Sequence, residues 1–259
     1  MTLSDVKCFL LDMDGTFYLG GQLIEGSLEF IDRVLATGRD YMFLTNNSSH
    51  NAAFYVQKLA KMGLSVERSR VLTSGEATCE KLRALYPGKR AFVLGNEFLL
   101  AEFRQAGIPV DMENPEIVVI GFDTTLDYRK MQAVCDFVRA GLPYFATHPD
   151  FNCPTETGFM PDIGAIMAFI EASTGRRPDL IVGKPHAGIV EAVLKRTGLR
   201  ADELAMVGDR LYTDIEPGLR SGMLSILVMS GETTEAMLAA SPTKPDLKFG
   251  RLADMIPLL

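Results

Sequence analysis

Short apolar runs alternate with amphipathic segments along almost the whole chain. The runs are rich in Val, Ile, Leu and Phe, which is typical of strands buried on both faces. The segments between them repeat their apolar residues at the spacing of one helix face. Strands are predicted at residues 6–11, 41–45, 91–94, 117–121, 144–146, 180–182, 204–208 and 225–229.

Helices are predicted between these strands, and glycine follows several of them, where helices commonly end. Thr73 and Glu76 have the spacing of a capping box at a helix start. Regular alternation of strand and helix favours a parallel sheet covered on both faces. We therefore predict an α/β fold with a Rossmann-like, doubly wound parallel sheet. The helices are expected at residues 28–37, 52–62, 77–85, 99–106, 128–140, 163–173, 188–197 and 214–221.

Composition narrows the classes of protein that fit. With 259 residues, 47% of them hydrophobic, the chain can form a core domain and a smaller second domain. The net charge of −7 argues against a general nucleic-acid or membrane surface. There is no apolar run of about eighteen residues and no basic–apolar leader, so neither a membrane span nor a signal peptide is expected. Four scattered cysteines without a CxxC pair favour a reduced, cytoplasmic protein.

Two carboxylates directly follow the first predicted strand, in Asp12-Met13-Asp14-Gly15-Thr16. Ligands bind at the carboxyl ends of parallel strands, and two close carboxylates repel each other unless a cation or a proton intervenes. The pair suits phosphoryl transfer. Asp12 would attack phosphorus, and Asp14 would give a proton to the leaving oxygen and later take one from water. The alternative is a capping Asp and a turn Asp beside glycine.

Three further predicted strands also end in polar side chains. Thr45 and Asn46 could bind phosphate at the start of a helix, or could simply cap it. Lys184 could neutralise phosphate charge, although lysines at such positions are commonly solvated surface residues. Asp209 suits a metal ligand, and Asp214 could orient Lys184 or a metal-bound water; two ordinary loop aspartates are the alternative.

The order of these four strand ends resembles the four motifs of the haloacid dehalogenase-like hydrolases. The resemblance implies an Mg²⁺ ion held by Asp12, Asp209 and the backbone carbonyl of Asp14, with Asp214 in support behind them. It also implies that Asp12, Asp14, Thr45 and Lys184 are the catalytic residues. Phosphate would be bound by Asp14, Gly15, Thr45, Asn46 and Lys184.

A segment of roughly a hundred residues with its own strand–helix alternation separates the threonine and lysine motifs. In the family, an α/β insertion at this point is a type C2 cap, which implies a core of residues 1–78 and 179–259 and a cap of residues 79–178. The stretches Thr45-Asn46-Asn47-Ser48 and Ala146-Thr147-His148-Pro149-Asp150 resemble the NagD-type, or 4-nitrophenylphosphatase-like, branch. His148 stands where many relatives have Asn, so substrate identity does not transfer.

The resemblance implies a Mg²⁺-dependent phosphatase that acts on a small phosphorylated metabolite through an aspartyl-phosphate. A phosphotransferase or mutase using the same intermediate, or a phospholigand-binding switch, remains an alternative. The substrate and any homo-oligomer are left open, and neither nucleic acid nor membrane is expected as a partner. Residues 148–162 are interpreted as a long loop in which His148, Asn152 and Asp162 line the specificity site; a solvated connection is the alternative.

Overall fold

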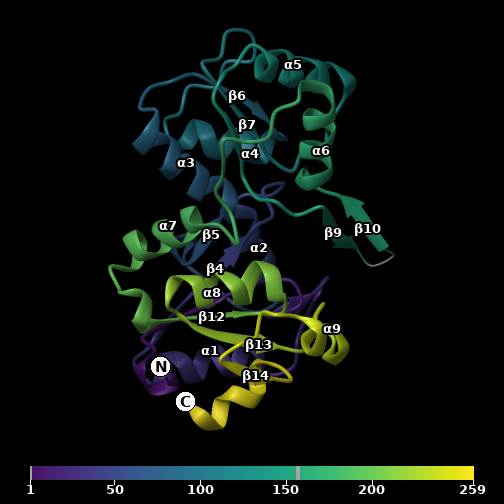
Figure 1. Ribbon diagram of the computed structural model, residues 1–259. Helices are drawn as coiled ribbons and strands as arrows, with labels where there is room; N and C mark the ends of the chain where they lie inside the picture. Colours follow the sequence, from purple (N-terminus) through teal and green to yellow (C-terminus); the bar gives the residue numbers. More distant parts are fainter. Residues whose placement is uncertain (1, 156–157) are drawn as a thin grey trace. The chain divides into compact units, whose positions relative to one another are not determined.

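The computed structural model describes residues 2–155 and 158–259 (Figure 1). The chain forms two compact units. The first unit comprises Met1–Thr45, Tyr55–Leu72 and Val193–Leu259, and the second comprises Asn46–Phe54 and Thr73–Ala192. Among the described residues, no helix is both long and apolar enough to cross a membrane.

A six-stranded sheet forms the centre of the first unit, in the order β14-β13-β12-β1-β4-β5. β1 pairs in parallel with both β12 and β4, so that Leu11 lies opposite Val207 on one side and Phe43 on the other. This register brings the carboxyl ends of the three strands to one edge. The strands are β1 (Cys8–Leu11), β4 (Asp40–Thr45), β5 (Val71–Thr73), β12 (Leu204–Gly208), β13 (Leu224–Val228) and β14 (Leu247–Phe249).

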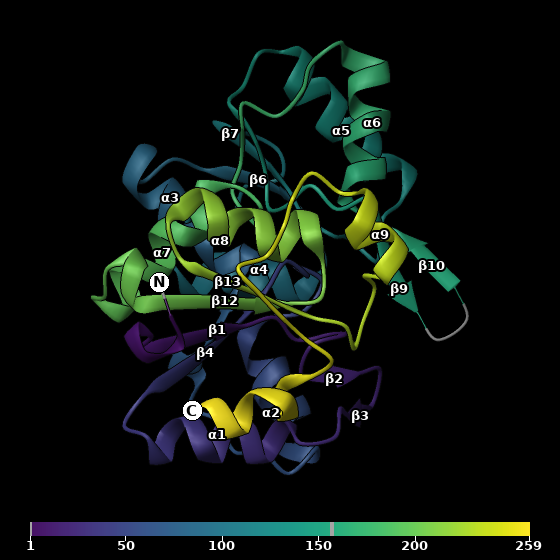
Figure 2. The same ribbon diagram turned by 60° about the horizontal axis from the view of Figure 1, so that its bottom comes forward.

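Helices cover both faces of this sheet, with α1 and α8 on opposite sides of it (Figure 2). The predicted helix at 214–221 differs from the structure, because Leu211–Ile215 form a π-helical turn before α8 begins at Glu216. The remaining elements include α1 (Ser27–Ala36), α2 (Ala52–Lys61), α8 (Glu216–Ser221), α9 (Glu235–Ala240) and the short antiparallel pair β2 (Tyr18–Leu19) and β3 (Gln22–Leu23).

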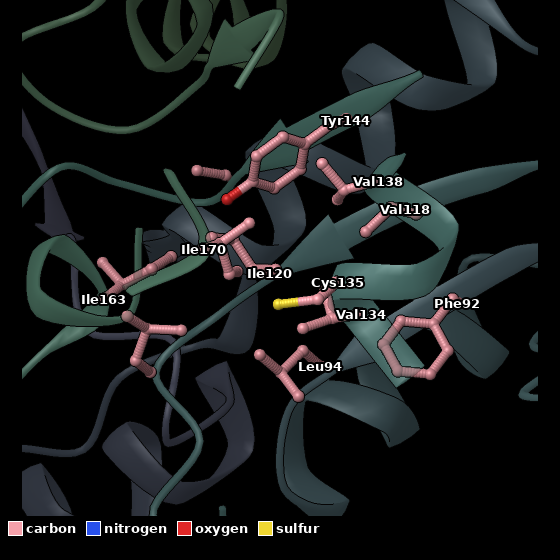
Figure 3. Packing of buried hydrophobic residues seen from close by; sticks show 12 residues of the cluster. Phe92, Leu94, Val118, Ile120, Val134, Cys135, Val138, Tyr144, Ile163 and Ile170 are labelled. Carbon is pink, nitrogen blue, oxygen red and sulfur yellow. The ribbon is translucent and has the colours of Figure 1, made fainter. Parts of the chain in front are cut away.

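The second unit has its own parallel sheet, in the order β11-β8-β7-β6. Figure 3 shows one of its apolar clusters, in which Val118, Ile120 and Tyr144 from the sheet meet side chains from two helices. The strands are β6 (Ala91–Leu94), β7 (Ile117–Ile120), β8 (Tyr144–Ala146) and β11 (Leu180–Ile181); the helices are α3 (Ser74–Leu85), α4 (Glu97–Gln105), α5 (Tyr128–Arg139) and α6 (Ile163–Thr174). The helix α7 (Ala187–Thr197) begins in this unit, and its residues from Val193 onward belong to the first.

The prediction that residues 148–162 form a long loop is wrong. β9 (Asn152–Thr155) and β10 (Gly158–Pro161) pair antiparallel within it, with Asn152 opposite Pro161. Both strands are largely exposed, so no apolar face marks them in the sequence. Each also contains a proline, which argues against an interior strand.

The predicted α/β fold class is confirmed, and each of the eight predicted strands is present within two residues of its expected ends. The division into core and cap stays a prediction. The observed units group residues 46–54, 73–78 and 179–192 with the second unit, whereas the predicted boundaries assign these residues to the core.

Candidate active site

Asp12 and Asp14 lie where β1 leaves the sheet. The backbone N–H of Asp12 still donates to the carbonyl of Val207, at 2.9 Å, so the neighbouring strand β12 fixes its position. Asp12 is half-buried and Asp14 is exposed. Asp12 is therefore held rigidly, while Asp14 is open to exchange protons with water.

Gly15 forms the turn that follows. Its φ of +88° favours glycine, and its N–H donates to the carbonyl of Tyr18 at 2.7 Å. A Cβ at this position would lie 2.5 Å from Asp209 Oδ2. The Ser230 hydroxyl donates to the Gly15 carbonyl at 2.7 Å. The turn thus brings its own backbone, Asp209 and the loop after β13 into contact.

Asp209 follows β12 and is buried. Its Oδ1 accepts from the Thr16 hydroxyl at 3.3 Å, and its Oδ2 accepts from the Glu232 backbone N–H at 2.7 Å. A Cβ at Gly231 would lie 2.0 Å from the same Oδ2. The loop around residue 231 therefore encloses the carboxylate so closely that a side chain at this position would displace it.

Three carboxylates meet at this edge of the sheet. Asp12, Asp209 and Asp214 each offer one oxygen, and these oxygens lie within 4.8 Å of one another. Asp214 is fully buried, and its Oδ2 accepts from the Arg210 backbone N–H at 3.1 Å. Carboxylates this close repel one another. The all-oxygen set fits a hard divalent cation such as Mg²⁺.

Arg210 adds a positive charge beside this cluster. Its Nε lies 2.9 Å from Glu232 Oε2. Burial disfavours the charged guanidinium, but the carboxylates of Asp12, Glu232 and Asp209 outweigh that cost and raise the pKa of Arg210 further. The side chain is therefore a permanent cation that offsets part of the repulsion.

Thr45 and Lys184 belong to different units. Thr45 ends β4 in the first unit and is buried. Asn46 and Lys184 belong to the second unit, where the Lys184 N–H donates to Asn46 Oδ1 at 2.8 Å and Asn46 Nδ2 donates to the Lys184 carbonyl at 2.9 Å. The lysine loop is thus bound to the residue that follows Thr45 in the chain.

Two of the three predicted specificity residues are buried and bonded to each other. His148 Nε2 lies 3.1 Å from Asp162 Oδ1, which also accepts from the Ile163 N–H and so caps α6. The Thr147 hydroxyl lies 3.1 Å from His148 Nδ1. Asn152, in contrast, is exposed at the start of β9.

Comparison with known proteins assigns the family. A model described as haloacid dehalogenase-like hydrolase matches residues 9–109, and one described as HAD-hydrolase-like matches residues 181–255. An acid sugar phosphatase of Staphylococcus aureus is 34% identical, over 98% of both chains. The chain belongs to the haloacid dehalogenase-like hydrolases.

Other members of this hydrolase family place the chain more finely. The structure of a 4-nitrophenylphosphatase from Thermotoga maritima is 47% identical, with a TM-score of 0.96 over 98% of each chain. A putative NagD protein is 43% identical, with a TM-score of 0.95 over the full length of both. A 5′-nucleotidase of Bacillus subtilis is 31% identical over 98% of both chains. This hydrolase is therefore of the NagD and 4-nitrophenylphosphatase branch.

Sequence reasoning missed part of the hydrolase site. Arg210 could have been noticed, because it directly follows Asp209 and precedes Asp214. Ser230, Gly231 and Glu232 carry no signal of their own in the sequence, since only the folded chain brings them to Asp209.

Proposed function

We propose that this hydrolase is a Mg²⁺-dependent phosphatase that cleaves small phosphate monoesters through an aspartyl-phosphate on Asp12. The observation that carries the proposal is the meeting of the Asp12, Asp209 and Asp214 carboxylates within 4.8 Å at the end of β1 and β12. Relatives named as phosphatases over nearly the whole chain support it.

In the first step, an Asp12 carboxylate oxygen forms a bond to phosphorus while the bond from phosphorus to the ester oxygen breaks. Asp14, in its protonated form, transfers its proton to the departing oxygen, which leaves as an alcohol. The exposure of Asp14 supports this role, because an acid that must be reprotonated needs access to water.

In the second step, water attacks the phosphorus of the aspartyl-phosphate and the bond to Asp12 breaks. Asp14, now a carboxylate, takes a proton from that water as it attacks. Inorganic phosphate leaves, Asp12 returns as a carboxylate and Asp14 is protonated again. Both side chains are thus back in their starting protonation states for the next turnover.

The metal would be held by Asp12, Asp209 and the backbone carbonyl of Asp14, with Asp214 supporting it from behind. When bound, Mg²⁺ would neutralise charge on the phosphate and on these carboxylates. Arg210 holds Glu232, whose backbone N–H in turn holds Asp209 Oδ2. We assign Arg210 a positioning role in the site.

The phosphate oxygens would be bound by Asp14, Gly15, Thr45, Asn46 and Lys184. Lys184 supplies a positive charge and Thr45 a hydroxyl, the two kinds of group that stabilise a transferring phosphoryl group. The pair of hydrogen bonds between Asn46 and the Lys184 backbone supports a shared role for the two motifs.

The substrate class is a small phosphorylated metabolite, such as a sugar phosphate or a nucleoside monophosphate. Relatives are named for both kinds of substrate. For specificity, exposed Asn152 is better placed than His148 and Asp162, whose side chains are occupied with each other. Replacing Asn152 with Ala should therefore change kcat/KM unequally across a panel of phosphate esters.

The deciding experiment measures phosphate release from such a panel with Mg²⁺ and with EDTA. The proposal expects steady multiple turnover with Mg²⁺ and none with EDTA. Activity that persists in EDTA would refute the metal assignment. Transfer of labelled phosphate to a second sugar instead of to water would favour a phosphotransferase, and a single stoichiometric phosphorylation would favour a switch.

A further inference from the structure

A cavity with charged side chains in its wall lies in the first unit, where the strands of its sheet begin. Its volume is about 680 Å³, within the range of small-molecule sites. Lys7 and Cys8 at the start of β1 line it, together with the first residues of β4 and the segment around residue 70. Arg196, Thr197 and Leu199, at and beyond the end of α7, complete the wall.

The wall carries a small excess of positive charge, although the chain as a whole is acidic. Arg70 is paired with Asp40, and its guanidinium lies 4.6 Å from the centre of the Tyr41 ring. Lys7 is paired with Glu203, at 2.6 Å. Counting Glu203, the cations outnumber the carboxylates by one. The cations are Lys7, Arg39, Arg70 and Arg196, and the carboxylates of the lining itself are Asp40 and Glu67.

Among the cations of this wall, Arg39 has a buried side-chain donor that is free to bind a ligand. Its backbone is fixed at the end of α1, where Gly38 has a φ of +75° and the Arg39 N–H donates to the carbonyl of Val34. Its Nη1 is buried and has no hydrogen-bond partner among the described residues. A buried guanidinium nitrogen without a partner is costly, and an oxyanion is the ligand that best satisfies it.

We propose that this cavity binds a small organic oxyanion, with Arg39 as its principal contact. Phosphate and carboxylate share the chemistry that a guanidinium recognises, two oxygens that accept parallel hydrogen bonds. The half-exposed side chain of Leu35 in the same wall offers an apolar surface to the organic part of the ligand. The volume admits a molecule of the size of a sugar phosphate.

The proposed site is separate from the catalytic edge. β1 runs from Cys8 in this cavity to Leu11, directly before Asp12. At about 3.3 Å per residue, the two sites are roughly 13 Å apart along that strand. A ligand here would therefore occupy its own site and would not compete with substrate for the catalytic carboxylates.

The test is a titration of the isotope-labelled protein, monitored through the NMR chemical shifts of its backbone amides. EDTA is present so that turnover does not intervene. The probes are inorganic phosphate, ribose 5-phosphate and malonate. Shifts at residues 7–8, 39–42 and 67–70 report the proposed site, and shifts at residues 12–16 report the catalytic edge. The two sites are thus read separately, whether or not the proposed phosphatase activity is correct.

Arg39→Gln should weaken the binding that shifts residues 39–42 by at least about tenfold, as expected for the loss of a charge-assisted hydrogen bond. Arg33→Gln, an equal charge change at an exposed position of α1 outside the cavity, should leave that binding unchanged. Shifts with phosphates alone would identify a phosphate-bearing ligand, and shifts with malonate alone a carboxylate. No shift with any probe, or equal binding in Arg39→Gln, would overturn the proposal.

Discussion

Gly231 shows how strongly single residues constrain the site. A Cβ there would meet Asp209 Oδ2 at 2.0 Å. Gly231→Ala should therefore displace the carboxylate and raise the Mg²⁺ concentration needed for half-maximal activity at least about tenfold, a change of roughly 1.4 kcal/mol. Activity measured against Mg²⁺ concentration checks this.

Gly21→Ala is the matched control for that substitution, because no atom in the described part of the chain lies within 4 Å of the Cβ it would add. It should leave the Mg²⁺ requirement as it is. If the two variants have the same requirement as the unchanged protein, then Asp209 is not the metal ligand that its packing suggests.

The role of Asp14 as the acid can be tested by comparing substrates with different leaving groups. Protonation of the leaving oxygen matters less for an activated leaving group such as 4-nitrophenolate. Asp14→Asn should therefore lose more of its kcat/KM with an alkyl phosphate than with 4-nitrophenyl phosphate. Equal losses on both substrates would contradict its role as the acid, provided that hydrolysis of the aspartyl-phosphate, measured separately, does not limit both rates.

Among the helices, α6 has an N-terminus that depends on a buried residue. Asp162 caps the helix and also bonds His148, so Asp162→Ala removes a cap and leaves a buried imidazole nitrogen without that partner. We expect a loss of about 2–4 kcal/mol in the free energy of unfolding. Asp162→Asn, which keeps an acceptor for the helix, should lose less.

The N-cap of α5 provides the comparison. Asp127 accepts from the Lys130 N–H at 2.9 Å at an exposed site, and its side chain makes no other hydrogen bond among residues 2–155 and 158–259. Asp127→Ala should cost only about 1 kcal/mol. Urea unfolding of the variants measures both values. Equal costs at the two caps would mean that the contact between His148 and Asp162 contributes nothing to stability.

Element by element, the sequence predicts most buried strands and misses exposed ones, although it also misses the short buried strand β5. The strands β1, β7 and β12 are apolar throughout because both faces of their sheets are covered. β3 and β10 are short and exposed or half-exposed, so no apolar pattern marks them. The same reasoning explains the site: Asp12 and Asp209 follow buried strands, whereas Gly231 reaches the site only through the folding of a loop.

At the scale of the whole molecule, the metal site should couple to stability. Three carboxylates whose oxygens lie within 4.8 Å repel one another. A bound cation removes that repulsion and stabilises the folded state by mass action. Mg²⁺ should therefore raise the melting temperature relative to EDTA. Calorimetry or thermal fluorescence checks this, and an identical melting temperature in both conditions would contradict it.

Asp214→Asn sharpens that comparison. The amide removes one negative charge yet keeps an oxygen that can accept from the Arg210 N–H. The variant should be more stable than the unchanged protein in EDTA, and Mg²⁺ should stabilise it less. If EDTA lowers the melting temperature of the variant and of the unchanged protein equally, Asp214 does not take part in the metal site.

The central claim is that the phosphoryl group is bonded to Asp12 before it is transferred to water. The most direct measurement is the intact mass of the protein, quenched in acid within milliseconds of mixing with 4-nitrophenyl phosphate and Mg²⁺. We predict that a fraction of the protein gains the mass of one phosphoryl group, that peptide analysis locates it on Asp12, and that Asp12→Asn neither gains it nor turns over substrate. A phosphoryl group on another residue, or turnover by Asp12→Asn, would contradict the account.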